Sequence, residues 1–85
     1  MKLKKNTAVN KDNGIWLCLG PERSAVAEED AFILELINDG ITDDEQLAKH
    51  IAKDDGDEIT ANLMLAQFVE RYGRFLEASN EYGII

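Results

Sequence analysis

The apolar residues of this chain change their spacing once, near residue 27, and this change limits the folds open to it. Residues 15–19 form a short apolar run in which neighbouring side chains point to opposite faces, as in a β-strand. From Glu28 onward the apolar residues recur every three or four positions, which is the spacing of helices. Strands followed by helices predict a small α+β domain.

The strand region has clear turn signals. Asp12-Asn13-Gly14 predicts a tight turn between a polar strand over residues 6–11 and the apolar strand over 15–19. Gly20-Pro21 ends that strand, and residues 23–26 are long enough for a third short one. Because residues 15–19 are apolar on both faces, we expect one face to pack on helices and the other to be available to a partner.

Three helices are expected after the strands. The first begins at Glu28 and stops at Asp39-Gly40, and Thr42 with Glu45 forms a capping box for the second. Asp57 is a plausible cap for a long third helix over residues 58–80. The expected buried faces are Phe32, Ile33, Leu36 and Ile37 in the first helix, Leu47, Ala48 and Ile51 in the second, and Leu65, Phe68, Val69, Tyr72, Phe75 and Leu76 in the third.

Length and charge restrict the partners. A chain of 85 residues suits one domain over 1–85, in which residues 1–6 are expected to be a basic, mobile arm. The net charge is −8, and residues 24–85 carry fifteen acidic side chains against four basic ones. Such a surface repels phosphate, so nucleic-acid binding is disfavoured and a protein or peptide partner is favoured.

The chain has no sign of secretion or membrane insertion. A single cysteine, Cys18, cannot form an internal disulfide. The basic start lacks the apolar stretch of a signal peptide, and no apolar run approaches the roughly 20 residues that a membrane span needs. We therefore expect a soluble cytoplasmic protein with no membrane partner.

Candidate catalytic and metal sites are weak. If Gly56 took the sixth position of a calcium loop, Ile51 and Lys53 would fall on ligand positions, and neither supplies an oxygen. Cys18 lies in an apolar strand, where a thiol is usually a small hydrophobe, and His50 has no zinc-ligand spacing to it. The sequence has no Gly-rich phosphate loop. We predict no enzyme activity, no metal site and no cofactor.

Several strings resemble, in order, segments of the PqqD-like peptide-recognition domains. Residues 24–37, Ser-Ala-Val-Ala-Glu-Glu-Asp-Ala-Phe-Ile-Leu-Glu-Leu-Ile, resemble the passage from the last strand into the first helix. Asp-Gly at 39–40 and Thr-Asp-Asp-Glu-Gln-Leu-Ala at 42–48 are similar to the turn and second helix. Phe-Leu-Glu at 75–77 and Tyr-Gly-Ile at 82–84 are similar to the closing helix and tail, so the resemblance spans about residues 7–85.

This resemblance implies a non-catalytic recognition element for ribosomally made, modified (RiPP) peptides. Its expected fold is winged helix-turn-helix-like, with a short three-stranded antiparallel sheet followed by three helices. Such domains bind the leader segment of a precursor peptide and present the peptide to a modifying enzyme, often a radical SAM enzyme. The leader joins the sheet edge as an extra strand, and its apolar side chains enter a groove between the third strand and the last helix.

Carried over by position, the resemblance implies two sets of peptide-binding residues. The edge strand consists of Arg23, Ser24, Ala25 and Val26. The groove consists of Phe68, Tyr72 and Phe75, with Arg71 near enough to pair with an acidic leader residue. An aromatic stripe at this spacing is more often core than binding site, so the sequence leaves open whether these three residues line a groove or fill the core.

Two other hypotheses belong to different classes. The acidity of residues 24–85 would also suit a winged-helix regulator or inhibitor that binds a basic or DNA-binding protein. Direct DNA binding through a helix-turn-helix is the weakest hypothesis, because the candidate recognition face offers only Arg71 and Arg74. The apolar triplet Leu63-Met64-Leu65 cannot be buried by one helix stripe, so the sheet, a second subunit in a homodimer, or a peptide partner must cover its other face.

Overall fold

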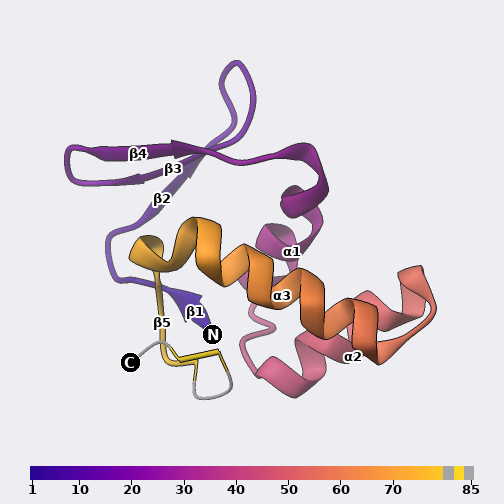
Figure 1. The fold of residues 1–85 in the computed structure, drawn as a ribbon. Helices are drawn as coiled ribbons and strands as arrows, with labels where there is room; N and C mark the ends of the chain where they lie inside the picture. The colour runs from indigo at the N-terminus through magenta and orange to yellow at the C-terminus, as the bar shows by residue number, and fades with distance from the viewer. Residues whose placement is uncertain (80–81, 84–85) are drawn as a thin grey trace.

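The computed structural model describes residues 1–79, 82 and 83 and has the expected α+β architecture (Figure 1). Three strands, three helices and a final extended segment follow one another, and a further short strand precedes them all. The elements are β1 (Lys2–Leu3), β2 (Ala8–Asn10), β3 (Trp16–Leu19), β4 (Glu22–Ala25), α1 (Glu28–Asn38), α2 (Asp44–Asp55), α3 (Glu58–Tyr72), the 3-10 turn η1 (Gly73–Phe75) and β5 (Leu76–Glu77).

The main sheet is antiparallel in the order β2-β3-β4. Asn13 and Gly14 form the turn between β2 and β3 with φ angles of 57° and 108°, the left-handed conformations that an Asn-Gly pair tolerates. Val9 pairs with Leu17, and Leu17 pairs with Ser24 across the sheet. Leu17 is fully buried, whereas Trp16, its neighbour on β3, is exposed. One sheet face therefore packs on the core and the other is open, as the apolar pattern predicted.

Helix caps follow local sequence rules with one correction. Asp57 caps α3 as predicted, and its carboxylate accepts a hydrogen bond from the Thr60 amide at 2.6 Å. For α2 the predicted cap, Thr42, is wrong by one residue. Asp43 is the cap and accepts from the Gln46 amide, because a carboxylate at that position reaches the third helical amide equally well.

The buried faces of α2 and α3 agree with the sequence patterns, and that of α1 is rotated. Ile33, Leu34 and Ile37 are buried, whereas Phe32, expected in the core, is 38% exposed. The rotation turns Asp30 inward with the buried stripe, since it lies one turn before Leu34. In α3 Leu65 is buried and Leu63 exposed, as expected for consecutive residues about 100° apart.

The third helix is shorter than predicted. It ends at Tyr72 rather than continuing to residue 80, and Gly73 begins the tighter turn η1. Glycine is a poor helix former, and the chain gains new backbone partners when Leu76 extends and pairs with Leu3 of β1. Asn80, the predicted last residue of this helix, lies outside the described residues, as does Ile84 of the predicted tail.

The expected free N-terminal arm over residues 1–6 is also wrong, because its first three residues are built into the fold. Met1 is 1% exposed, and its ammonium group donates to the Asp44 carboxylate and to the Thr42 carbonyl, each at 2.5 Å. Ser79 donates to the same Asp44 carboxylate at 2.8 Å. These partners satisfy the buried Asp44 carboxylate, and they bring Met1 and Ser79 together at the start of α2.

The core lies between the open sheet and the helices. In Figure 1 α3 crosses beneath the sheet, α2 packs along the first half of α3, and β1 with β5 lies beside its end. The 3-10 turn η1 packs under β3, which places Phe75 in the core near Leu17. Among the described residues, no helix has the length and apolar character that crossing a membrane requires.

Candidate functional site

The free edge of β4 offers backbone groups that the sheet does not use. The Val26 amide donates to the Ile15 carbonyl at 2.8 Å, which fixes Ile15 and Val26 as a hydrogen-bonded pair. Such pairs alternate in antiparallel sheets, so Ser24 also bonds to β3 while Arg23 and Ala25 point their amides and carbonyls outward. The Ala25 carbonyl accepts only a long contact, 3.3 Å, from the Ser24 hydroxyl.

The opposite edge of the same sheet offers less. In β2 only Val9 directs its backbone amide and carbonyl to the free side. Ala8 and Asn10 are opposite Cys18 and Trp16, whose backbone groups face β2 and bond to them. A new strand would therefore find two outward residues on β4 and one on β2. Within the described residues no other strand lies beside β4 on its free side (Figure 1). Such an unpaired edge is a template for another extended chain.

The open face of the sheet contains a hollow of about 300 Å³. Its lining residues share the face opposite Leu17, and they come from β2, the following turn, β3 and β4. They are Asn10, Asp12, Trp16, Cys18 and Arg23.

The Trp16 ring is held at the rim of this hollow. Its indole nitrogen donates to the Asn13 carbonyl at 3.4 Å, and the ring is 37% exposed. Ala25 lies directly across the strand pair from Trp16 and next to the free edge. Because alanine is small, the ring remains accessible from that edge.

A buried polar network fixes the chain just after β4. Tyr72 donates from its hydroxyl to the Asp30 carboxylate at 2.7 Å and accepts from the Ala27 amide at 3.0 Å. Arg71 donates to the same carboxylate at 3.0 Å. Asp30 is 4% exposed, so these contacts compensate for the burial of its charge. The network connects the end of α3 to the junction of β4 and α1.

The network also shifts the acid–base behaviour of its members. Burial raises the pKa of the Tyr72 phenol, the hydrogen bond from the Ala27 amide opposes this, and the bond to Asp30 adds to the rise. The hydrogen bond to Asp30 and its negative charge raise the pKa of Arg71 further above its ordinary range. With a raised pKa, the Tyr72 hydroxyl stays protonated as a hydrogen-bond donor, and with its own raised pKa Arg71 stays positively charged.

The structure answers the question that the sequence left open about the aromatic stripe. Phe68 and Phe75 are fully buried and Tyr72 is 3% exposed, and the Phe68 and Tyr72 rings are in contact with centroids 5.0 Å apart. These three residues form the core beneath the sheet, so they cannot line an open groove. Helical spacing showed that they share a face and could not show what covers that face.

The other predicted site residues divide between the edge and the network. Arg23, Ser24 and Ala25 lie in β4, while Val26 is buried just beyond its end. Arg71 is half-exposed, yet it already pairs with Asp30 and lies 3.9 Å from a Glu29 carboxylate oxygen. An acidic ligand residue would have to compete with both carboxylates for this guanidinium group.

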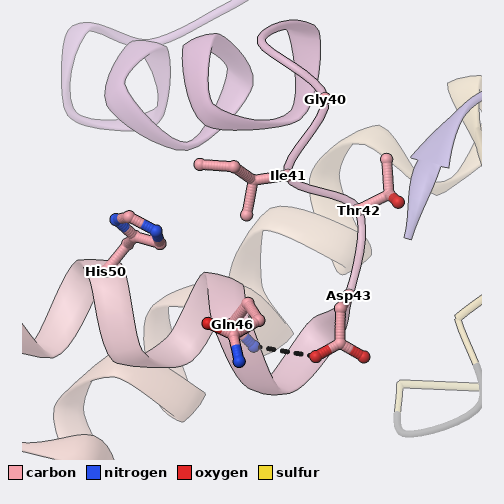
Figure 2. A pocket seen from close by; sticks show the side chains of 6 residues that line it. All are labelled: Gly40, Ile41, Thr42, Asp43, Gln46 and His50. Carbon is pink, nitrogen blue, oxygen red and sulfur yellow. Dashed lines mark hydrogen bonds between the residues drawn. The ribbon is translucent and has the colours of Figure 1, made fainter.

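A second hollow, of about 270 Å³, lies at the turn between α1 and α2 (Figure 2). Figure 2 shows His50 and Gln46 on one side of it and Ile41 on the other, with the Asp43 carboxylate directed to the Gln46 amide. Neither Cys18 nor any residue of the β4 edge lines this second hollow. Among the described residues, no three His, Cys, Asp or Glu side chains are grouped in a way that could hold a metal ion.

Sequence reasoning missed two parts of this region. The hollow on the open face brings Asn10, Asp12 and Trp16 together; the alternation of residues 15–19 separated two apolar faces and did not tell which of them is open. Asp30 lies in the acidic first turn of α1, and its role in the network has no local signal in the sequence, since Tyr72 lies 42 residues away. No protein-family model, curated protein or solved structure matches this chain.

Proposed function

We propose that this chain is a non-catalytic cytoplasmic adaptor that binds an extended peptide by adding it to the free edge of β4. The observation that carries the proposal is the pair of outward-facing residues, Arg23 and Ala25, on an edge strand whose outer side has no neighbouring strand among the described residues. Strand addition uses such groups for affinity, because each backbone amide and carbonyl of the edge gains a partner.

The resemblance of about residues 7–85 to PqqD-like domains supplies the class of peptide. On this proposal the ligand is the leader segment of a ribosomally made precursor, and the adaptor presents it to a modifying enzyme of the radical SAM or another class. The buried aromatic stripe limits the contact to the β4 edge and the open sheet face. Leader side chains therefore contact the sheet instead of a groove along α3.

A pair of proline variants tests the edge directly. Ala25→Pro removes an amide that points away from β3, so the sheet keeps its hydrogen bonds while the incoming strand loses a donor and meets the proline ring. Ser24→Pro is the matched control, because it removes an amide that bonds to β3 and should destabilise the sheet itself. We expect Ala25→Pro to remain folded and to bind peptide at least about tenfold more weakly.

The binding assay is an amide-resolved NMR titration of the labelled protein with the leader segment of a short precursor peptide, repeated with duplex DNA. Strand addition should shift the amides of residues 22–27 with the peptide and leave them unchanged with DNA. Wild-type binding that survives Ala25→Pro unchanged would refute addition at this edge. Amide shifts on addition of the DNA would instead favour the helix-turn-helix hypothesis.

The acidic helices support one competing function. The fifteen acidic residues of positions 24–85 would attract a basic or DNA-binding protein, as an inhibitor does. Binding through that surface should weaken steeply with salt, whereas strand addition should be only mildly sensitive. A partner affinity that falls many-fold between low and physiological salt, with no shift in β4, would support the inhibitor.

A further inference from the structure

The hollow lies on the sheet face that two side chains of an added strand would share, and it reaches β4 at Arg23. A strand paired with β4 alternates its side chains between the two sheet faces, and the residues opposite Arg23 and Ala25 point to the same face as those two side chains. This is the face of Trp16 and Cys18, since Ala25 pairs with Trp16 and Arg23 pairs with Cys18. Two ligand side chains, two residues apart, would thus reach the hollow.

The position opposite Ala25 suits a bulky apolar side chain. Ala25 leaves room at the edge, and the exposed Trp16 ring lies immediately behind it, held by its hydrogen bond to the Asn13 carbonyl. A hollow of about 300 Å³ has room for an aromatic side chain. Two aromatic rings in offset or edge-to-face contact attract each other beyond the area that they bury.

The position opposite Arg23 suits an acidic side chain. Arg23 makes no ion pair within the described part of the chain, and its neighbours across the hollow are neutral apart from Asp12. The sheet, residues 8–25, contains two basic and two acidic residues, so it repels an acidic ligand less than the strongly acidic helices do. A ligand carboxylate beside Arg23 would gain a charge-assisted hydrogen bond.

We infer that the hollow is a specificity subsite for an extended peptide segment in which a bulky apolar residue is followed, two positions later, by an acidic one. The order follows from antiparallel pairing, the more stable arrangement, in which the ligand runs from Ala25 toward Arg23. This inference rests on the proposed function, because the subsite is filled only when a strand lies along β4.

Three blocked nine-residue peptides separate the subsite from strand addition. The first contains Phe-Thr-Asp at the centre of a threonine-rich sequence, the second the reversed Asp-Thr-Phe, and the third threonine at all three positions. Affinity is measured by the same NMR titration, following the amides of Arg23 and Ala25 and the Trp16 indole. We expect the first peptide to bind about tenfold more tightly than either of the others.

Two protein variants assign the preference to residues. Trp16→Ala should weaken the Phe-Thr-Asp peptide about three- to tenfold and leave the all-threonine peptide nearly unchanged. Arg23→Glu should weaken it by a similar factor, and a Phe-Thr-Lys peptide should regain the lost affinity on this variant alone. Because both side chains are exposed and outside the core, unchanged thermal unfolding midpoints are the control for intact folding.

The possible failures have different meanings. Equal binding of all three peptides, with β4 shifts, would overturn the subsite and keep strand addition. Absence of β4 shifts with every peptide would overturn both. Shifts in β4 that depend on protein concentration without any peptide would identify a second copy of this chain as the occupant of the edge, and would overturn the peptide assignment.

Discussion

Removal of a single hydroxyl group tests whether the buried network holds the fold together at β4. In Tyr72→Phe the ring remains, and so does its contact with Phe68, while two hydrogen bonds disappear: one to the Asp30 carboxylate at 2.7 Å and one from the Ala27 amide at 3.0 Å. A hydrogen bond to a charged group contributes about 1.5–3 kcal/mol, and one between neutral groups about 0.5–1.5 kcal/mol. The expected loss is about 2–4 kcal/mol.

This loss is large for so small a domain. Domains are stable by only about 5–15 kcal/mol, and in one of this length 1 kcal/mol shifts the melting midpoint by about 4–8 °C. Thermal and urea unfolding followed by circular dichroism should show a midpoint about 10–25 °C lower with an unchanged denaturant slope. Ser24→Ala removes the hydroxyl of a half-buried residue whose hydrogen bond is long, 3.3 Å, and should stay within about 0.5 kcal/mol of the wild type.

A double-mutant cycle with Asp30→Asn identifies the network as the cause. If the hydroxyl acts through Asp30, the double variant should lose at least about 1 kcal/mol less than the sum of the single variants. A Tyr72→Phe protein that unfolds within about 0.5 kcal/mol of the wild type would refute the reasoning. Strict additivity would also contradict it, because the two groups would then act independently.

The remaining predictions concern pH, the N-terminus and the core. The pKa of Tyr72 is raised in the folded protein, so it contributes stability that is present below the ordinary phenol value of about 10 and lost as pH rises through the higher folded value. Tyr72→Phe should therefore reduce the dependence of the unfolding midpoint on alkaline pH. A hydrogen bond from the Thr60 amide lowers the pKa of Asp57, so this cap stabilises above the ordinary value of about 3.9 and fails as pH falls through the lower folded value. Asp57→Asn should keep the cap and reduce the dependence of urea midpoints on acid pH, and an unchanged dependence would contradict the assignment. Asp44→Ala leaves the Met1 ammonium and the Ser79 hydroxyl without their shared partner and should cost about 3–5 kcal/mol in urea unfolding, whereas a change below about 1 kcal/mol would show that water replaces it. Phe68→Ala should cost about 3–5 kcal/mol, as expected for a fully buried ring, and a stable variant with weakened peptide binding would mean that the ring lines a groove after all.

The features that the sequence predicted correctly are local ones. The turn at Asn13-Gly14, the cap at Asp57 and the helix start at Glu28 each depend on residues within one turn of chain. Their physical cause is backbone conformation or capping, which a few neighbouring residues determine. The α+β architecture follows from these signals together with the two apolar periods.

The sequence did not predict the contacts between residues that are far apart in the chain. β1 pairs with β5, and the Met1 ammonium meets Asp44, so neither the extent of α3 nor the fate of the N-terminal residues could be deduced from nearby positions. A terminal Met-Lys-Leu segment has the same local pattern whether it is solvated or paired. Only tertiary contact decides between these states, and it overrides helix propensity after Tyr72.

The same distinction applies to the candidate site. The edge strand over residues 23–26 was predicted from chain order and is found at 22–25, because strand position follows from the turns on either side. The groove assignment for Phe68 and Phe75 depended on whether anything covers their helix face. In the structure α1 and α2 pack against α3, and β3 packs against η1, so both rings are covered and the open face of the sheet is left as the region with unassigned side chains.

The network and the β4 edge should have separable effects on binding. Tyr72 fixes Ala27, two residues beyond Ala25, and makes no contact with a strand added to the edge, so it acts by keeping that edge in a single conformation. Tyr72→Phe should therefore weaken the Phe-Thr-Asp and all-threonine peptides by the same factor, while Arg23→Glu should weaken only the peptide that carries the acid. Hydrogen exchange of the Ala27 amide should accelerate in Tyr72→Phe and stay unchanged in Arg23→Glu. If Tyr72→Phe instead changed the ranking of the two peptides, the hydroxyl would take part in recognition, and the peptide would have to reach the end of α3.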